Sequence, residues 1–256
     1  MSHPYVIWTM RRTGGTTLAS LLSTLSEHRG VEHEPFNNER MYGHISQTFA
    51  QTSDAVQLRT DLQSCLAERP VIKHCYELMS HAFNAVLFEV STALGYQHII
   101  LDRRSETERI LSLELAHLTG AWGGEAAQKI YPAIETGEMA LQPINMQRAE
   151  RQMRLCNTRR QELAQITDDA GIAPFVVYFE DVYSDPVAGR ALIERLLAFL
   201  GIRPEEHPDY EHLVSDALLR RGQNSARILQ AVPDVDMAVK KLEALRRVQT
   251  TAFMPS

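Results

Sequence analysis

Tyr5-Val-Ile-Trp-Thr-Met-Arg-Arg-Thr-Gly-Gly-Thr-Thr-Leu18 stands near the beginning of a chain of 256 residues. Its apolar run from Tyr5 to Trp8 is short and rich in aromatic and β-branched side chains, which predicts a buried β-strand. Leucines at positions 18, 21, 22 and 25 have the spacing of one helix face and predict a helix after the turn. A strand, a glycine turn and a helix in this order direct successive backbone N–H groups toward an anion.

The turn combines charge, glycine and hydroxyl groups in seven residues, which are Arg11, Arg12, Thr13, Gly14, Gly15, Thr16 and Thr17. The glycines let the backbone approach a phosphate closely, the threonine hydroxyls add donors, and Arg12 adds a fixed positive charge. An ordinary tight turn before a helix is the alternative interpretation. The turn is not a Walker A loop, because the dipeptide Gly-Lys occurs nowhere in the sequence.

The rest of the chain alternates predicted strands with predicted helices. The strands cover residues 71–76, 96–101 and 173–179, with a short strand end and a turn at 31–38. The helices cover residues 54–68, 83–94, 105–118, 143–170, 186–200 and 236–248. Little periodicity is present at 120–137. The polar segment at 39–53 is predicted to be a loop with one helical turn, and residues 201–234 are predicted to be mainly irregular with short helices. Alternation of this kind indicates an α/β fold with a central parallel sheet flanked by helices.

Composition excludes several classes of protein. A net charge of −6 argues against a nucleic-acid binder, which would carry a basic surplus. The three cysteines (Cys65, Cys75 and Cys156) have no metal or redox spacing and predict reduced thiols of the core. No signal peptide and no run of 18 apolar residues is recognisable, so we expect a cytoplasmic protein without a membrane span.

A second pattern, Leu101-Asp-Arg-Arg-Ser-Glu-Thr-Glu-Arg-Ile-Leu-Ser112, places an arginine after a strand and a serine eight residues later on the next helix. Ligands of open parallel sheets bind at the carboxyl ends of strands, so Arg104 and Ser112 could face the same crevice as the first turn. A guanidinium binds a phosphate with a planar fork of donors, and a serine adds one more bond. The alternative is that Arg103, Arg104 and Arg109 are solvated charges at a helix start, paired with Glu106 and Glu108.

These two patterns resemble the PAPS-dependent sulfotransferases, in particular the bacterial enzymes for carbohydrates and small molecules. Arg12-Thr-Gly-Gly-Thr-Thr17 is similar to the family's Arg/Lys-Ser-Gly-Thr-Thr loop, which grips the 5′-phosphate of the sulfate donor, and differs from it at Gly15. Arg104 and Ser112 match the family's 3′-phosphate pair. The late segment Arg220-Arg221-Gly222 is similar to an Arg-Lys-Gly segment that closes over the nucleotide, with a solvated basic turn as the alternative.

The resemblance implies a P-loop-type three-layer sandwich and a single sulfotransferase-like domain over residues 1–256. Segments 36–68 and 120–145 would then be insertions that shape the acceptor pocket. PAPS would be the co-substrate and PAP the product. The acceptor would be a small molecule or carbohydrate with a hydroxyl group, and the oligomeric state is left open. No metal is expected, because a sulfuryl group carries less charge than a γ-phosphate.

Transfer also needs a base, for which the resemblance offers Glu34 and His74. Glu34, in His33-Glu-Pro-Phe36, occupies the place of a glutamate in the bacterial carbohydrate enzymes, and His74 that of a histidine in the animal cytosolic enzymes. We favour Glu34, with its pKa raised by the ring of Phe36. A surface carboxylate and a core histidine are the alternative interpretations.

The sequence thus predicts in-line transfer of a sulfuryl group from PAPS to an acceptor hydroxyl, with Arg12 stabilising the charge on the bridging oxygen. A P-loop nucleotide or small-molecule kinase is the alternative enzyme and would require ATP and magnesium. A non-catalytic nucleotide-binding module is the third possibility.

Five arginines lie on the long predicted helix at 143–170: Arg148, Arg151, Arg154, Arg159 and Arg160. They predict a solvated face paired with Glu150 and Glu162, or a patch for an anionic acceptor.

Overall fold

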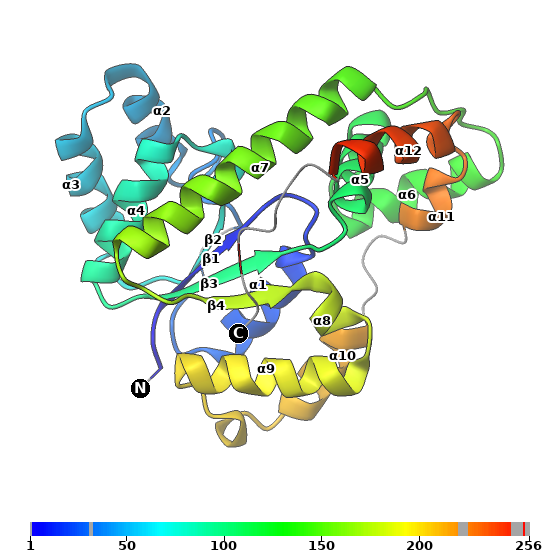
Figure 1. The fold of residues 1–256 in the computed structure, drawn as a ribbon. Helices are drawn as coiled ribbons and strands as arrows, with labels where there is room; N and C mark the ends of the chain where they lie inside the picture. Colours follow the sequence, from blue (N-terminus) through cyan, green and yellow to red (C-terminus); the bar gives the residue numbers. More distant parts are fainter. Residues whose placement is uncertain (1, 31–32, 220–224, 247–252, 254–256) are drawn as a thin grey trace. The chain divides into compact units, whose positions relative to one another are not determined.

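The computed structural model describes residues 2–30, 33–219, 225–246 and 253. Its four strands form one parallel sheet in the order β2-β1-β3-β4 (Figure 1). The strands are β1 (Tyr5–Thr9), β2 (Ile72–Cys75), β3 (Gln97–Asp102) and β4 (Phe175–Tyr178). The predicted α/β architecture, a central parallel sheet flanked by helices, is confirmed.

Helices fill most of the remaining described chain. The α-helices are α1 (Gly15–Leu25), α2 (Gly43–Thr52), α3 (Ala55–Leu66), α4 (His81–Ala93), α5 (Glu106–Thr119), α6 (Gly124–Glu135), α7 (Met146–Asp169), α8 (Phe179–Tyr183), α9 (Pro186–Leu200), α10 (Tyr210–Leu219), α11 (Ser225–Leu229) and α12 (Val235–Arg246). Two 3₁₀ turns are η1 (Tyr76–Leu78) and η2 (Pro204–Glu206).

Two of these helices correct the sequence prediction: α2 fills most of a segment predicted to be a loop with one helical turn, and α6 fills most of a segment predicted without regular structure. Helices α10 and α11 are short helices of the kind predicted at 201–234. Helix α6 buries Ala127, Tyr131 and Ile134, whose spacing is that of a helix face, although glycine precedes the helix and Pro132 lies inside it. Helix α2 begins without a side-chain cap. Tertiary packing outweighs these weak local signals.

The chain forms two compact units. The first comprises Met1–Asp102, Thr158–Leu219 and Ala252–Ser256, and the second comprises Arg103–Asn157 and Arg220–Thr251. The first unit holds the sheet, and the second is built from α5, α6, the first half of α7, α11 and α12. No helix among the described residues is both long and apolar enough to cross a membrane.

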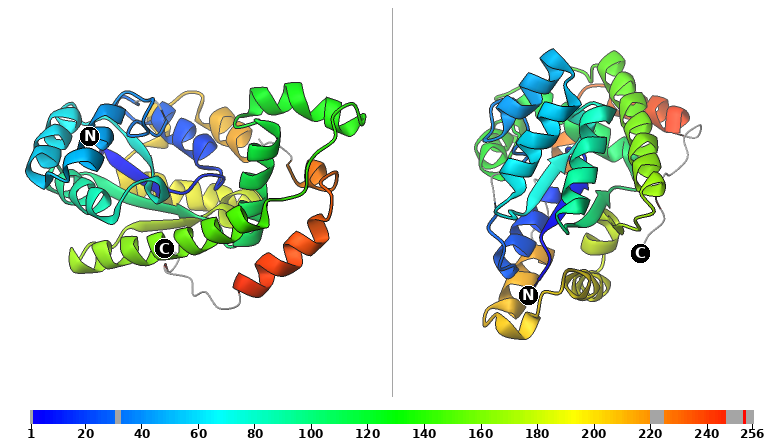
Figure 2. Two further views of the ribbon diagram at one scale, coloured as in Figure 1. Left: turned by 90° about the horizontal axis from the view of Figure 1, so that it is seen from above. Right: turned by 90° about the vertical axis from the view of Figure 1, so that its left-hand side faces the viewer.

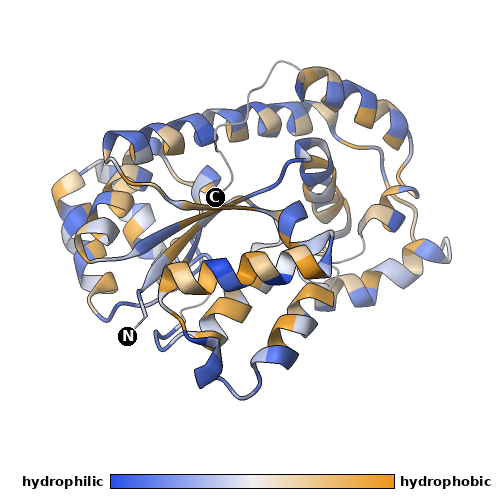
Figure 3. Ribbon diagram, turned by 60° about the horizontal axis from the view of Figure 1, so that its bottom comes forward, coloured by the Kyte–Doolittle hydropathy of each residue, from blue (hydrophilic) through white to orange (hydrophobic). Residues whose placement is uncertain are grey.

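Helices cover both faces of the sheet in the first unit (Figure 2). On one face, Ile7, Leu101 and Val177 belong to a buried cluster that also contains residues of α1, α9 and α10. On the other face, Trp8 packs against Phe88 of α4, with ring centroids 5.8 Å apart. The strands are hydrophobic along much of their length, whereas many helices carry one hydrophobic and one hydrophilic side (Figure 3). This arrangement follows from the alternation of side chains along each strand.

The second face contains two buried histidines. Trp8 Nε1 donates to His98 Nδ1 at 3.0 Å, and His98 Nε2 bonds Thr92 Oγ1 at 2.8 Å. His74 Nε2 bonds Asn84 Oδ1 at 2.8 Å. Burial lowers the pKa of both histidines to about 4.

A buried ion pair joins β3 to α7. Arg160 of α7 donates from Nε and Nη2 to the two carboxylate oxygens of Asp102, at 2.6 and 2.9 Å. Both side chains are almost fully buried. The expectation that Arg160 belongs to a solvated face is therefore wrong.

The two buried histidines predict a loss of stability in mild acid. The unfolded chain binds a proton at each histidine near pH 6.5, whereas the folded chain does so only near pH 4. Their stabilising contribution is complete above pH 6.5 and falls as pH decreases from 6.5 to 4, by up to about 3 kcal/mol per histidine. Urea unfolding at pH 7.5, 6.0 and 5.0 measures this loss.

The matched variant is His98→Gln, which can still accept from Trp8 and donate to Thr92 but does not titrate. It should show a shallower decline of the free energy of unfolding between pH 7.5 and 5.0 than the wild type. Equal slopes for both proteins would contradict the assignment.

Candidate functional site

The turn between β1 and α1 alternates in backbone handedness, as concave anion sites do, and for this resemblance residues 11–17 are called the anion-binding loop. Arg12 and Gly14 adopt left-handed conformations, with φ of 68° and 76°, and Thr13 between them has negative φ. Alternating handedness of this kind is the backbone pattern with which concave anion sites direct successive N–H groups toward one side. The strand, turn and helix predicted from the sequence are thus present in the structure.

The start of α1 belongs to the same loop. Gly14 is its N-cap and provides no side-chain hydrogen bond, so the first backbone N–H groups of the helix lack the usual side-chain acceptor. The side chain of Thr16 is exposed, and that of Thr17 is half-buried. A helix start of this kind favours a negative group through its N–H donors and its dipole.

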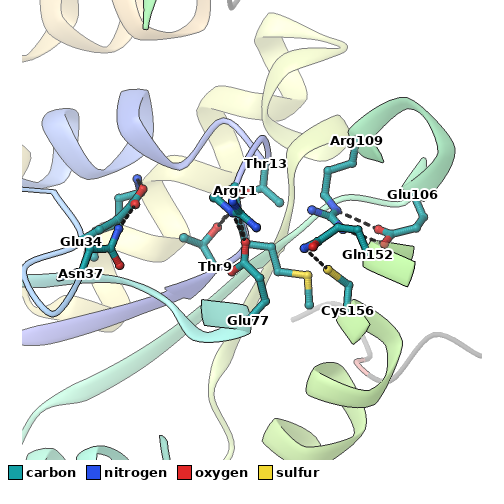
Figure 4. A network of polar contacts seen from close by, with 12 residues as sticks. Thr9, Arg11, Thr13, Glu34, Asn37, Glu77, Glu106, Arg109, Gln152 and Cys156 are labelled. Atoms are coloured by element: carbon teal, nitrogen blue, oxygen red, sulfur yellow. Dashed lines mark hydrogen bonds and ion pairs between the residues drawn. The ribbon is translucent and has the colours of Figure 1, made fainter. Parts of the chain in front are cut away.

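Thr13 holds the shape of the turn with its side chain. Its hydroxyl is buried, donates to the Met10 carbonyl at 2.7 Å and contacts the hydroxyl of Thr9 (Figure 4). The expectation that this hydroxyl faces the ligand as a donor is not met in the structure. The backbone of Thr13 remains part of the anion-binding loop.

Two side chains pack closely against the glycines of the loop. A Cβ atom at Gly14 would lie 2.6 Å from Phe179 Cδ2, and one at Gly15 would lie 3.1 Å from Lys73 Cε. Phe179 in turn packs against Tyr183 with ring centroids 4.8 Å apart. Glycine is therefore required at position 14 for both its backbone conformation and its space.

Glu34 lies in an ion pair with Lys73 of β2. Lys73 Nζ donates to Glu34 Oε1 at 2.7 Å, and Asn37 Nδ2 donates to Oε2 at 2.8 Å. Burial alone would raise the pKa of Glu34, but the charge of Lys73 and the hydrogen bonds from Lys73, Cys75 and Asn37 hold it below its ordinary value. The carboxylate is therefore ionised at neutral pH.

The expected role of Phe36 at this carboxylate is therefore wrong, because the pKa of Glu34 is lowered and not raised. The ring of Phe36 is fully buried and packs edge-on against His74 and Phe83, with centroids 5.7 and 5.5 Å apart.

His74 is placed in the core rather than at the site. It is 2% exposed, bonds Asn84 and lies edge-on to Trp8, with ring centroids 5.2 Å apart. Its neighbour Lys73 lies on the opposite face of β2, because successive side chains of a strand alternate. The expectation that His74 takes the proton of an acceptor is corrected: an imidazole so enclosed is a satisfied core histidine.

Lys73 is the residue that the sequence analysis missed. The register of the sheet pairs it with Ile7 of β1, on the face that α1 covers. Its side chain is 8% exposed, passes beside Gly15 and ends at Glu34. The available signal was a lysine inside an otherwise apolar strand.

Arg11 is bound by a second carboxylate. Both its backbone N–H and its Nε donate to Glu77 Oε1, at 2.9 and 3.0 Å (Figure 4). Glu77 lies in η1, directly after β2, so the ends of two neighbouring strands meet at the loop.

The second unit carries Arg104 and Ser112. Arg104 is exposed in the turn before α5, and Ser112 is buried on that helix. Arg109 pairs with Glu106 through two bonds, at 2.9 and 2.8 Å, but it is fully buried and not a solvated charge (Figure 4). Arg103 pairs with Glu108. Arg220, Arg221 and Gly222 lie outside the described residues.

A second carboxylate of the same helix is also bound by an arginine, here a partly exposed one from α7. Arg148 binds the buried carboxylate of Glu114 through Nε and Nη2, the latter at 2.7 Å. Arg148, like Arg160, is thus engaged with a buried partner rather than with Glu150 or Glu162. Among the described residues, His, Cys, Asp and Glu side chains form no group of three or more that could hold a metal ion.

A scan against protein-family models, a search of curated proteins and a search of solved structures each found no match.

The close approach of Phe179 predicts that Gly14→Ala disrupts the loop. The new methyl group would meet the ring and would also impose backbone strain at positive φ, at a cost of about 1–3 kcal/mol for the strain alone. Thermal unfolding measures the loss of stability, and titration with inorganic sulfate measures the loss of anion binding.

Gly120→Ala is the matched control, because Gly120 has a similar φ of 72° and nothing within 4 Å of the added Cβ. It should destabilise less than Gly14→Ala and leave sulfate binding unchanged. An equal loss of stability for both variants would show that contact with Phe179 does not shape the loop.

Proposed function

We propose that the protein is a PAPS-dependent sulfotransferase that transfers a sulfuryl group to the hydroxyl of a small-molecule or carbohydrate acceptor. One observation carries the proposal: a single side chain, Lys73, lies beside Gly15 of the anion-binding loop and ends in an ion pair with Glu34. The side chain of Lys73 therefore connects the loop to an ionised carboxylate, that of Glu34. Sulfuryl transfer needs this combination of an anion cradle and a nearby base.

The anion-binding loop binds the sulfate donor, PAPS. Backbone N–H groups from Gly14 to Thr17 bind the 5′-phosphate, as they do in other loops at helix starts. The guanidinium of Arg12 stabilises the charge that develops on the bridging oxygen. Arg104 and Ser112 bind the 3′-phosphate in this proposal, as the resemblance implies. The P-loop type of the fold is part of the same proposal.

Glu34 supplies the base. The acceptor oxygen forms a bond to sulfur while its proton passes to the Glu34 carboxylate. The bond between sulfur and the bridging oxygen breaks, and its electron pair stays on the phosphate of PAP. Lys73 keeps Glu34 ionised, so the carboxylate is ready to accept a proton at neutral pH.

Binding of the product tests the proposal first. We expect PAP to bind more tightly than AMP or ATP in metal-free buffer, because AMP and ATP lack the 3′-phosphate. Arg104→Ala should weaken the binding of PAP much more than the binding of adenosine 5′-phosphosulfate, because the latter has no 3′-phosphate. Isothermal titration with each ligand gives the dissociation constants.

Arg103→Ala is the matched control, since it removes an arginine of the same turn that pairs with Glu108 at 2.5 Å. It should change binding of both ligands slightly and equally. Equal losses for both ligands in Arg104→Ala would overturn the 3′-phosphate assignment. Preference for ATP with a strict need for Mg²⁺ would favour the kinase instead.

The state of Glu34 predicts the pH dependence of turnover. Glu34→Gln keeps the shape but removes the proton acceptor, and should lower kcat by about 10²–10⁴-fold with little change in PAP affinity. In the wild type, the acid limb of kcat/KM should lie below the ordinary pKa of a glutamate, because that of Glu34 is lowered.

Lys73→Met removes the attraction that lowers the pKa of Glu34 while burial continues to raise it. The acid limb should therefore move to higher pH. Asn37→Ala, which removes one hydrogen bond from the same carboxylate, should move it in the same direction by less. Circular dichroism at each pH separates this effect from unfolding. An acid limb that stays in place in Lys73→Met would exclude Glu34 as the base.

A further inference from the structure

The contact between Arg11 and Glu77 reaches the anion-binding loop from the neighbouring strand. One carboxylate oxygen, Glu77 Oε1, receives both the backbone N–H and the Nε of Arg11. The side chain of Glu77 is fully buried, whereas that of Arg11 is 23% exposed. The pair therefore fixes the first arginine of the loop in both its backbone and its side chain.

Arg11 is the cation that compensates the negative charge of Glu77. Its second oxygen, Oε2, is buried and has no hydrogen-bond partner among the described residues. A carboxylate taken out of water is costly unless a cation compensates it. Arg11 supplies this compensation, so the pair together adds no net charge to the loop.

We propose that Glu77 determines the ligand specificity of the loop by cancelling the charge of Arg11. The loop then favours a weakly charged terminal sulfuryl group over a more highly charged phosphate chain. Sites for nucleoside triphosphates gather several cations around the phosphates, including a lysine and magnesium. The inference rests on the proposed sulfotransferase function and adds to it a residue that distinguishes sulfate from phosphate.

Adenosine 5′-phosphosulfate and ADP provide the test, because they have nearly the same shape but ADP carries about one more negative charge. Glu77→Gln retains an oxygen that can accept from Arg11 but removes the negative charge. Glu77→Gln should strengthen the binding of ADP more than that of adenosine 5′-phosphosulfate. The ratio of their dissociation constants should therefore shift by about three- to tenfold at low salt. The titrations are done in metal-free buffer at about 0.03 M and at about 0.5 M salt. The screening length at about 0.5 M is roughly fourfold shorter, so the shift in the ratio should be smaller there.

The double variant Arg11→Gln/Glu77→Gln removes both charges and should return the ratio to that of the wild type. Arg11→Gln alone should shift it in the opposite direction to Glu77→Gln. A purely structural role would weaken both ligands in both single variants by the same factor and leave the ratio unchanged. If Arg11→Gln does not fold, Glu77→Gln and the double variant still decide the matter.

Ligand binding by the wild-type protein distinguishes a failure of this inference from a failure of the proposed function. If the wild type binds neither PAP nor adenosine 5′-phosphosulfate, the sulfotransferase proposal fails. If it binds them but the ratio to ADP is the same in the wild type, Glu77→Gln and the double variant, the role of Glu77 is overturned while the sulfotransferase proposal stands.

Discussion

The ion pair between Lys73 and Glu34 is the interaction on which the chemistry of this site depends. It connects the edge strand β2 to the segment after α1, and it determines the ionisation of the carboxylate. It exists because the register of the sheet places Lys73 on the face that α1 covers. A shift of one residue in that register would place His74 there instead and move the lysine into an aromatic core.

Features that depend on near neighbours in the chain could be predicted from the sequence. The strand from Tyr5, the glycine turn after it and the parallel sheet follow from short-range patterns. The helices α2 and α6 could not be predicted well, because neither begins with a side-chain cap, and α6 also begins with glycine and contains Pro132.

Pairings between distant residues were also missed. Lys73 and Glu34 are 39 positions apart, and Arg11 and Glu77 are 66 apart. Local spacing suggested Glu150 and Glu162 as partners for the arginines of α7. This is confirmed for Arg154 and Arg159, whereas Arg160 binds Asp102 across 58 positions. A charge run thus indicates a solvated face only while no buried carboxylate from elsewhere in the fold competes for it.

The position of the Asp102–Arg160 pair has a consequence for the modular character of the chain. Asp102 is the last residue before the chain leaves the first unit, and Arg160 follows its return at Thr158 by two residues. The buried pair therefore clamps together the two ends of a long excursion, at residues 103–157. Helices α11 and α12 complete the core of the second unit together with this excursion, so the pair holds both ends of the one segment on which that core depends.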